Sequence, residues 1–172
     1  MHIRQATLQD LKEIMCTTEL AFENELTSDN QEHTLVEELM RSDSYIPELT
    51  LVATIDNKIV GYIMYSKITI DAYDGFAMAP LSVHPDYQKQ GIGTALLHYT
   101  LSMIPLSVPV VILGHPSYYN KFGFIKASTY NIKAPFEVQM MYLWYEHQNK
   151  LKKKVFRGQL FIRKHFSKYN KT

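Results

Sequence analysis

The stretch from Pro80 to Leu97, which reads PLSVHPDYQKQGIGTALL, constrains the fold of this chain most. A short apolar run at Leu81 to Val83 precedes a polar segment with two glycines, and then come apolar residues at helical spacing: Ile92, Ala95, Leu96 and Tyr99. This order predicts a strand, a glycine turn and a helix start. Helix starts present unpaired N–H groups and a partial positive charge, and Gly91 and Gly93 lack side chains. The stretch therefore favours phosphate binding.

Length and composition indicate one buried core. The chain has 172 residues, of which 46% are hydrophobic, so we expect a single domain. One cysteine, Cys16, excludes an internal disulfide and an all-cysteine metal site, and its place in an apolar helical pattern predicts a core residue. The N-terminus lacks the apolar core of a secretion signal, and no apolar run approaches the roughly twenty residues of a membrane span. We expect a cytoplasmic protein without a membrane partner.

Charge is distributed unevenly along the chain. The formal net charge is +1, but residues 150–172 hold nine basic residues and no acidic one. The first forty-four residues hold ten acidic residues and three basic ones. The basic tail also contains bulky apolar residues, which we expect to pack on the body while the charges stay in water: Val155, Leu160, Phe161 and Phe166.

The N-terminal part predicts a strand and two helices. Residues 2–5 read as a strand, and Thr7 with Asp10 forms a capping pair for a first helix. A second helix is expected after Asp29, with Glu32 completing its capping pair. Its core side carries four apolar residues at helical spacing: Leu35, Val36, Leu39 and Met40.

The remaining elements alternate between strands and helices. Leu51–Ile55, a turn at 56–58 and Ile59–Ile70 predict a hairpin, and a second turn at 71–75 leads into a strand at 76–83. Pro80 inside that strand removes a hydrogen-bond donor, which predicts a bulge or a splayed edge. Further expected elements are a helix at 92–104, a strand at 108–113 buried on both faces, a short helical segment at 117–122 ended by Gly123, and strands at 124–126 and 138–145.

Several common phosphate and metal sites are not matched by the sequence. The chain has no G-x-x-x-x-G-K-S/T segment, which excludes a P-loop. Leu96 stands where a dinucleotide-binding fingerprint needs its third glycine, and no acidic residue ends the following strand. The histidines at 84, 98 and 115 lack metal-ligand spacing, so we expect no metal.

Two segments resemble the GNAT superfamily of acyl-CoA-dependent N-acyltransferases. QKQGIG at residues 88–93 matches the family's R/Q-x-x-G-x-G/A pyrophosphate loop, and YNKFGF at 119–124 matches its Y-x-K-x-G-F segment. The element order agrees over most of residues 1–146. The resemblance implies a mixed α/β fold: a mostly antiparallel central sheet, splayed between strands 4 and 5 and flanked by about four helices. It implies a catalytic domain at 1–146, with the basic extension at 147–172 packed on it.

The resemblance implies acetyl-CoA as the co-substrate. In the family, pantetheine pairs with the fourth strand where it diverges from the fifth. That region corresponds here to Leu81, Ser82 and Val83. The pyrophosphate would lie on the loop and the helix start, which consist of Gln88, Lys89, Gln90, Gly91, Ile92, Gly93 and Thr94.

Acyl transfer to an amine needs a polarised carbonyl and a proton for the departing thiolate. Thiols have pKa values near 8.5 and tyrosine near 10, so a phenol at the sulfur can supply that proton. By its match to the second motif, Tyr119 is the expected acid, with Tyr118 as its rival and a packing role as the alternative. A backbone N–H of the splayed strand, such as that of Val83, would polarise the carbonyl.

The base and the acceptor stay open in the sequence. Glu23 and Glu25 at the end of the first helix and His115 after the buried strand are candidates for the acceptor side. The acidic N-terminal part favours a cationic amine, and we expect a small-molecule primary amine that attacks directly in a ternary complex. The alternatives are an aminoacyl-tRNA or protein amine recruited by the basic tail, and a non-catalytic acyl-CoA-binding module. A homodimer is also left open.

Overall fold

The computed structural model describes residues 1–24, 31–70, 73–114, 116–130, 132–133, 141–144 and 158–161. The chain divides into two compact units: one contains Met1–Ser66 and Ala79–Ile104, and the other contains Lys67–Met78 and Pro105–Thr172. Each unit therefore contains part of two long strands, β3 (Lys58–Ile70) and β4 (Tyr73–Val83). The expected boundary at residue 146 lies outside the described residues, and the division into domain and extension stays a prediction.

An antiparallel hairpin forms the centre of the first unit. Strand β1 (His2–Gln5) pairs with β2 (Leu51–Ile55), and β2 pairs with β3. Asp56 and Asn57 join β2 to β3 with φ angles of 49° and 62°. Two such residues match the twist of the flanking strands, and Asp and Asn adopt positive φ more readily than most residues. The hairpin is confirmed, although Lys58 begins β3 instead of ending the turn.

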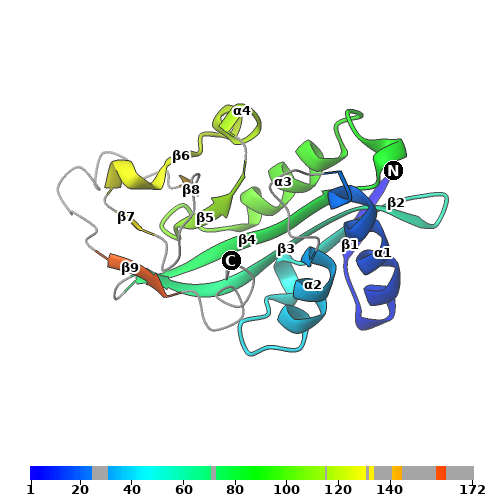
Figure 1. The fold of residues 1–172 in the computed structure, drawn as a ribbon, viewed down its shortest axis with the longest axis horizontal. Coiled ribbons are helices and arrows are strands. Elements are labelled where there is room, and N and C mark those ends of the chain that lie inside the picture. Colours follow the sequence, from blue (N-terminus) through cyan, green and yellow to red (C-terminus); the bar gives the residue numbers. More distant parts are fainter. Residues whose placement is uncertain are drawn as a thin grey trace. The chain divides into compact units, whose positions relative to one another are not determined.

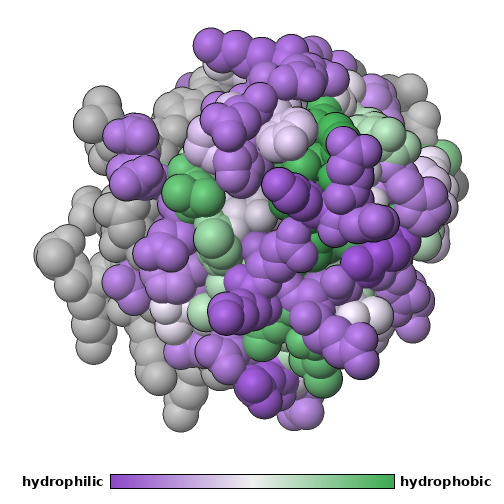
Figure 2. Space-filling model, turned by 90° about the vertical axis from the view of Figure 1, so that its right-hand side faces the viewer, coloured by the Kyte–Doolittle hydropathy of each residue, from purple (hydrophilic) through white to green (hydrophobic). Residues whose placement is uncertain are grey.

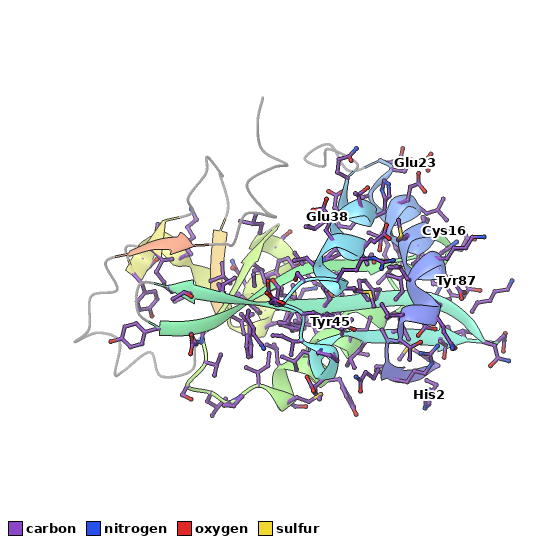
Figure 3. The ribbon with its side chains drawn as sticks, turned by 90° about the horizontal axis from the view of Figure 1, so that it is seen from below. His2, Cys16, Glu23, Glu38, Tyr45 and Tyr87 are labelled. Atoms are coloured by element: carbon purple, nitrogen blue, oxygen red, sulfur yellow. The ribbon has the colours of Figure 1, made fainter. Side chains whose placement is uncertain are left out.

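Helices cover both faces of these strands. Helix α1 (Leu11–Phe22) lies beside α2 (Glu32–Met40), as Figure 1 shows. Figure 3 shows α1 and α2 on one face of the strands and α3 (Ile92–Met103) on the other. The four apolar residues expected on the core side of α2 are all buried. Asp29 lies outside the described residues.

The capping pair before α1 forms as expected. It lies in a short 3₁₀ turn at Leu8–Asp10, and the Asp10 carboxylate accepts the Thr7 N–H at 2.8 Å and the Thr7 hydroxyl at 2.9 Å. Arg4 from β1 donates two further bonds of 2.7 Å to the same carboxylate. The first strand, the cap and the helix are thereby joined through one side chain.

Helix α3 packs closely on β3 because Gly61 has no side chain. A Cβ at Gly61 would lie 2.8 Å from Ile92 Cγ2 and 3.1 Å from Leu96 Cδ1. Further along the same face, the hydroxyls of Tyr65 and Thr100 are 2.8 Å apart. These contacts hold the first turns and the C-terminal half of α3 on the strand.

The second unit contains the parallel strand pair. Phe76–Met78 of β4 pair in parallel with Val110–Ile112 of β5 (Val110–Leu113), and β4 continues to Val83 beyond this ladder. Strand β5 pairs antiparallel with β8 (Met141–Trp144), and β8 pairs antiparallel with β6 (Ile125–Lys126). Val110, Val111 and Ile112 are all buried, as expected for this strand, whereas Leu113 at its end is 37% exposed. The mixed α/β fold is confirmed.

The basic tail contributes a strand to the second unit. Strand β9 (Gly158–Phe161) pairs in parallel with β7 (Ile132–Lys133) and antiparallel with the end of β3. Leu160 and Phe161 therefore lie in a strand, whereas Val155 and Phe166 lie outside the described residues. Helix α4 (Pro116–Tyr119) and 3₁₀ turns at Asn120–Phe122 and Ala127–Tyr130 complete this unit.

Some details of the sequence interpretation of strands and helix faces were wrong. Tyr73–Gly75 belong to β4 and not to a turn, while residues 71 and 72 lie outside the described residues. Strand β5 begins at Val110 and not at residue 108. Tyr99 is 52% exposed, because the buried face of α3 is rotated towards Leu97 and Leu101.

The surface is mainly polar where Figure 2 shows it. Hydrophilic side chains predominate on that face, and hydrophobic ones form small patches between them. Among the described residues, none of the helices is both long and apolar enough to cross a membrane.

Candidate active site

The start of α3 is built as the sequence indicates. Strand β4 ends at Val83, a 3₁₀ turn follows at Pro85–Tyr87, and α3 begins at Ile92. The N-cap residue is Gly91, whose φ is 84° and whose carbonyl accepts the Ala95 N–H at 2.9 Å. A positive φ favours glycine at this position, because other side chains are strained there.

The N-terminus of α3 is open to an anion. No side chain caps it, and its first turn contains no acidic residue. A Cβ at Gly91 would have no atom within 4 Å, so the space in front of this turn is free. The first N–H groups of the helix therefore have no side-chain cap, and no acidic side chain in the first turn compensates the positive end of the helix dipole. Lys89 adds an exposed cationic side chain to the same loop and also has a positive φ, 60°.

The loop is tied to the end of β4 by hydrogen bonds. Gln88 Nε2 donates to the Val83 carbonyl at 3.1 Å, and the next peptide N–H, that of His84, donates to the Val60 carbonyl of β3 at 2.9 Å. The peptide between Val83 and His84 is thus held on both sides. Gln90 Nε2 donates to the Asp86 carbonyl at 3.1 Å. Both glutamine side chains expected near the cofactor are bonded to the backbone of this segment.

The end of β4 presents alternating faces. Ser82 is 2% exposed, and its hydroxyl lies 3.0 Å from that of Thr18 in α1. Leu81 and Val83 are half-buried. The Ser82 side chain therefore faces α1, which leaves only its backbone for a ligand.

Tyr119 lies in α4 of the second unit, packed among aromatic rings. Its ring meets that of Tyr118 edge-on at 4.9 Å and that of Phe124 at 5.7 Å between centroids. Burial, and to a smaller extent Tyr118, raises the pKa of the Tyr119 phenol, so the proton is held throughout the neutral range. The rival Tyr118 lies under the Lys121 ammonium, which is 4.7 Å from its ring centroid.

The structure says less about the residues proposed for the acceptor side. Glu23 is exposed just after α1, where Figure 3 labels it, while Glu25 and His115 lie outside the described residues. His84 Nδ1 accepts the Asp86 N–H at 3.3 Å. Within the described ranges, no group of three or more His, Cys, Asp or Glu residues is arranged to hold a metal.

The expectation that Cys16 is a core residue was wrong. Cys16 is exposed, and Figure 3 shows it on α1. The buried residues of this helix are Ile14, Thr17 and Thr18. Because a helix advances 100° per residue, a side chain two positions after Ile14 points to the opposite side.

Two glycines that the sequence interpretation did not single out make close contacts, one in each unit. Gly61 admits the start of α3, and Gly114 contacts the ring of Tyr119. A glycine within a strand can signal close approach of a neighbouring element, so Gly61 carried a usable signal. The contact of Gly114 depends on how the chain turns into α4, and the sequence alone does not give that turn.

Comparison with known proteins points to the same family as the two sequence motifs. The family model of the acetyltransferase (GNAT) domain matches residues 47–126. Two proteins of Escherichia coli K12, named as the uncharacterised N-acetyltransferases YjhQ and YhbS, are each 34% identical to the chain, over 101 and 100 residues. These matches cover 55% of this chain and 56% and 59% of the two relatives. The chain thus spans a little over half the length of the curated relatives it matches.

Two solved structures are similar over nearly the whole chain. A GNAT family acetyltransferase from Brucella melitensis in complex with acetyl-CoA is 26% identical with a TM-score of 0.74, covering 96% of this chain and 97% of that one. YhbS from Escherichia coli in complex with CoA is 25% identical with a TM-score of 0.79, covering 96% and 91%.

The fold and the loop define a mixed α/β domain with an uncapped helix start. The comparisons then show which family it is similar to. Residues 47–126 match the GNAT acetyltransferase domain, and the two similar structures extend the likeness over nearly the whole chain, in agreement with the resemblance found in the sequence.

Proposed function

We propose that this protein is an N-acetyltransferase that transfers the acetyl group of acetyl-CoA to the primary amine of a small molecule. The observation that carries the proposal is the open start of α3, with its positive-φ Gly91 and the exposed cation of Lys89. One similar structure was solved with acetyl-CoA and the other with CoA, which supports the same donor.

The residues present fit the donor. Its pyrophosphate would lie on the backbone N–H groups between Lys89 and Thr94, where no cap and no acidic side chain competes. Its pantetheine would pair with the backbone of Leu81–Val83. Because the Ser82 hydroxyl is bonded to Thr18, that pairing would use main-chain atoms.

Each remaining role is assigned to a residue of this chain. When bound, acetyl-CoA supplies the thioester whose carbon–sulfur bond breaks as the amine nitrogen bonds to the carbonyl carbon. The Val83 N–H would polarise the carbonyl oxygen. Tyr119 would give its proton to the departing sulfur, a role that needs a phenol protonated at neutral pH. The Tyr119 phenol meets this condition, since burial raises its pKa above the ordinary value of about 10.

The amine must lose a proton to become a nucleophile. Glu23, Glu25 and His115 remain the proposed groups on the acceptor side. Ten of the first forty-four residues are acidic, and this excess would favour the encounter with a cationic amine.

Binding and turnover test the proposal separately. Acetyl-CoA should raise the thermal stability of the protein in proportion to the logarithm of its concentration above the Kd. Thiol release from acetyl-CoA should accelerate with at least one amine of a panel of polyamines, amino acids and aminoglycosides. Tyr119→Phe should keep the stabilisation and lower kcat by about 10²-fold.

Each alternative gives a distinct result. No stabilisation at millimolar acetyl-CoA would exclude the proposed donor. Stabilisation without turnover for any small amine, tRNA or protein would indicate a binding module. Turnover with a macromolecule alone that falls when Lys152, Lys153 and Lys154 become Gln would indicate recruitment by the tail. Substitution is preferable to truncation here, because the tail contributes β9.

A further inference from the structure

We infer that Gly114 is a positioning residue: because it lacks a side chain, it provides the space in which the Tyr119 ring is held. The inference rests on the proposed function for its catalytic meaning, since Tyr119 is the proposed acid. Its structural content does not depend on any activity.

The contact between Gly114 and Tyr119 is unusually close. A Cβ on Gly114 would lie 2.5 Å from Cε2, 3.2 Å from Cδ2 and 3.5 Å from Cζ of the Tyr119 ring. Real Cβ atoms essentially never approach another heavy atom below 3.0 Å. One edge of the ring therefore occupies the volume that any other residue at position 114 would fill.

Backbone conformation does not explain this glycine. The glycines with positive φ among the described residues are Gly91 and Gly123, both at 84°, and Gly114 is not one of them. An alanine at position 114 would meet no left-handed strain. The steric conflict with Tyr119 is the cost that the structure shows for such a change.

The ring has little freedom to move away. Tyr118 packs against it edge-on with an interplanar angle of 89°, and Phe124, which is 1% exposed, packs against it at 65°. Gly114 directly follows the last residue of β5, and Tyr119 is the last residue of α4. The position of the phenol is thus set by a backbone contact and two aromatic neighbours.

Position matters for a proton donor. A general acid must lie within about 2.6–3.2 Å of the atom it protonates. A displacement of about 1 Å can cost on the order of 10²-fold in rate. A Cβ at position 114 would have to move the ring by several tenths of an ångström or more to reach ordinary contact.

Gly114→Ala tests the inference in the full-length protein. We expect kcat to fall about 10- to 100-fold, with the KM for acetyl-CoA within about twofold of wild type, because the proposed phosphate contacts are made elsewhere. Ser117→Ala, at an exposed position of α4, is the matched control and should leave both constants unchanged. In a Tyr119→Phe background, Gly114→Ala should cause little further loss of kcat, because the acid is already absent.

A second readout needs no activity. With ¹³C-labelled tyrosine, the NMR signal that disappears in Tyr119→Phe identifies this ring. That signal should shift in Gly114→Ala and stay in place in Ser117→Ala. If wild type turns over no amine, the proposed function fails, and the NMR comparison still decides whether Gly114 places the ring.

A second substitution provides a control in case the Gly114→Ala variant does not fold. If Gly114→Ala unfolds, Gly114→Ala combined with Tyr119→Leu should restore the folded state, because the smaller side chain removes the conflict. An unmoved Tyr119 signal in Gly114→Ala, a kcat loss that adds fully to that of Tyr119→Phe, or a double variant that stays unfolded would overturn the inference.

Discussion

The Gln88 side chain donates a hydrogen bond of 3.1 Å to the carbonyl oxygen of Val83. This bond joins the proposed pyrophosphate loop to the last residue of the strand proposed to hold pantetheine. The N–H of the same peptide group, which belongs to His84, donates to the Val60 carbonyl. Two parts of the proposed donor site are therefore linked before any ligand binds, which lowers the cost of ordering them.

Replacing Gln88 tests the value of this link. Gln88→Leu keeps the approximate size but removes the donor, and it should weaken acetyl-CoA binding about three- to tenfold, the effect of one lost hydrogen bond. Gln88→Arg, which can still donate to a carbonyl, should stay closer to wild type. Isothermal titration with acetyl-CoA measures both. Equal affinities for the Leu and Arg variants would show that the bond does not prepare the site.

Lys89 provides a test of phosphate recognition. Lys89→Asn removes the charge, and Asn tolerates the positive φ of 60° at this position. We expect a loss of roughly tenfold in acetyl-CoA affinity and a weaker dependence of that affinity on salt, since a screened charge pair is gone. Binding of S-acetylpantetheine, which lacks the pyrophosphate, should not change. A similar loss for both ligands would place Lys89 outside the phosphate site.

The sequence predicted the elements of this region better than it predicted their contacts. The glycine turn and the start of α3 follow from local rules: helical spacing, a glycine at positive φ and an absent cap. The capping pair of Thr7 and Asp10 is likewise local and formed as expected. The sequence did not predict the hydrogen bond from the Gln88 side chain to the Val83 carbonyl. A glutamine side chain and a backbone carbonyl can each bond to many other groups, so the sequence alone does not select this pair.

Errors arose where burial depends on tertiary packing. Cys16 and Tyr99 were assigned to apolar helix faces, and both are exposed. Apolar spacing gives the existence of a helix, but a shift of one position in its buried face changes which residues are covered. For the proposed site, the loop was recognisable as a motif. The close contact between the Tyr119 ring and Gly114 could not be predicted, because it depends on the path of the chain between β5 and α4.

Gly61 should be intolerant of a side chain. Gly61→Ala places a methyl group 2.8 Å from Ile92 Cγ2 and should destabilise the protein by about 1–3 kcal/mol through overpacking. Ile92→Ala alone should also destabilise, by leaving a cavity. The double variant should lose less than the sum of the two, because the new methyl enters the vacated space. Urea unfolding measures all three, and strictly additive losses would contradict the contact.

The ion pair of Arg4 and Asp10 should make stability depend on pH in the acid range. The hydrogen bonds from Arg4 lower the Asp10 pKa to about 2, against burial, which raises it. A lowered folded-state pKa stabilises the protein above the unfolded value, near 3.9, and this contribution is lost as the pH falls towards 2. Because the Arg4 side chain is 39% exposed, we expect a contribution of about 1–2 kcal/mol.

Urea unfolding at a series of pH values measures this contribution. Between pH 4 and pH 2, the free energy of unfolding should fall less steeply in Asp10→Asn than in wild type, because the substituted side chain takes up no proton. Glu37→Gln is the matched control: its ion pair with Arg41 is largely exposed, with side-chain exposures of 64% for Arg41 and 41% for Glu37. That variant should follow the wild-type curve closely, since exposed pairs contribute little. Parallel curves for wild type and Asp10→Asn would mean that the carboxylate at the start of α1 gains nothing from Arg4 in the folded protein.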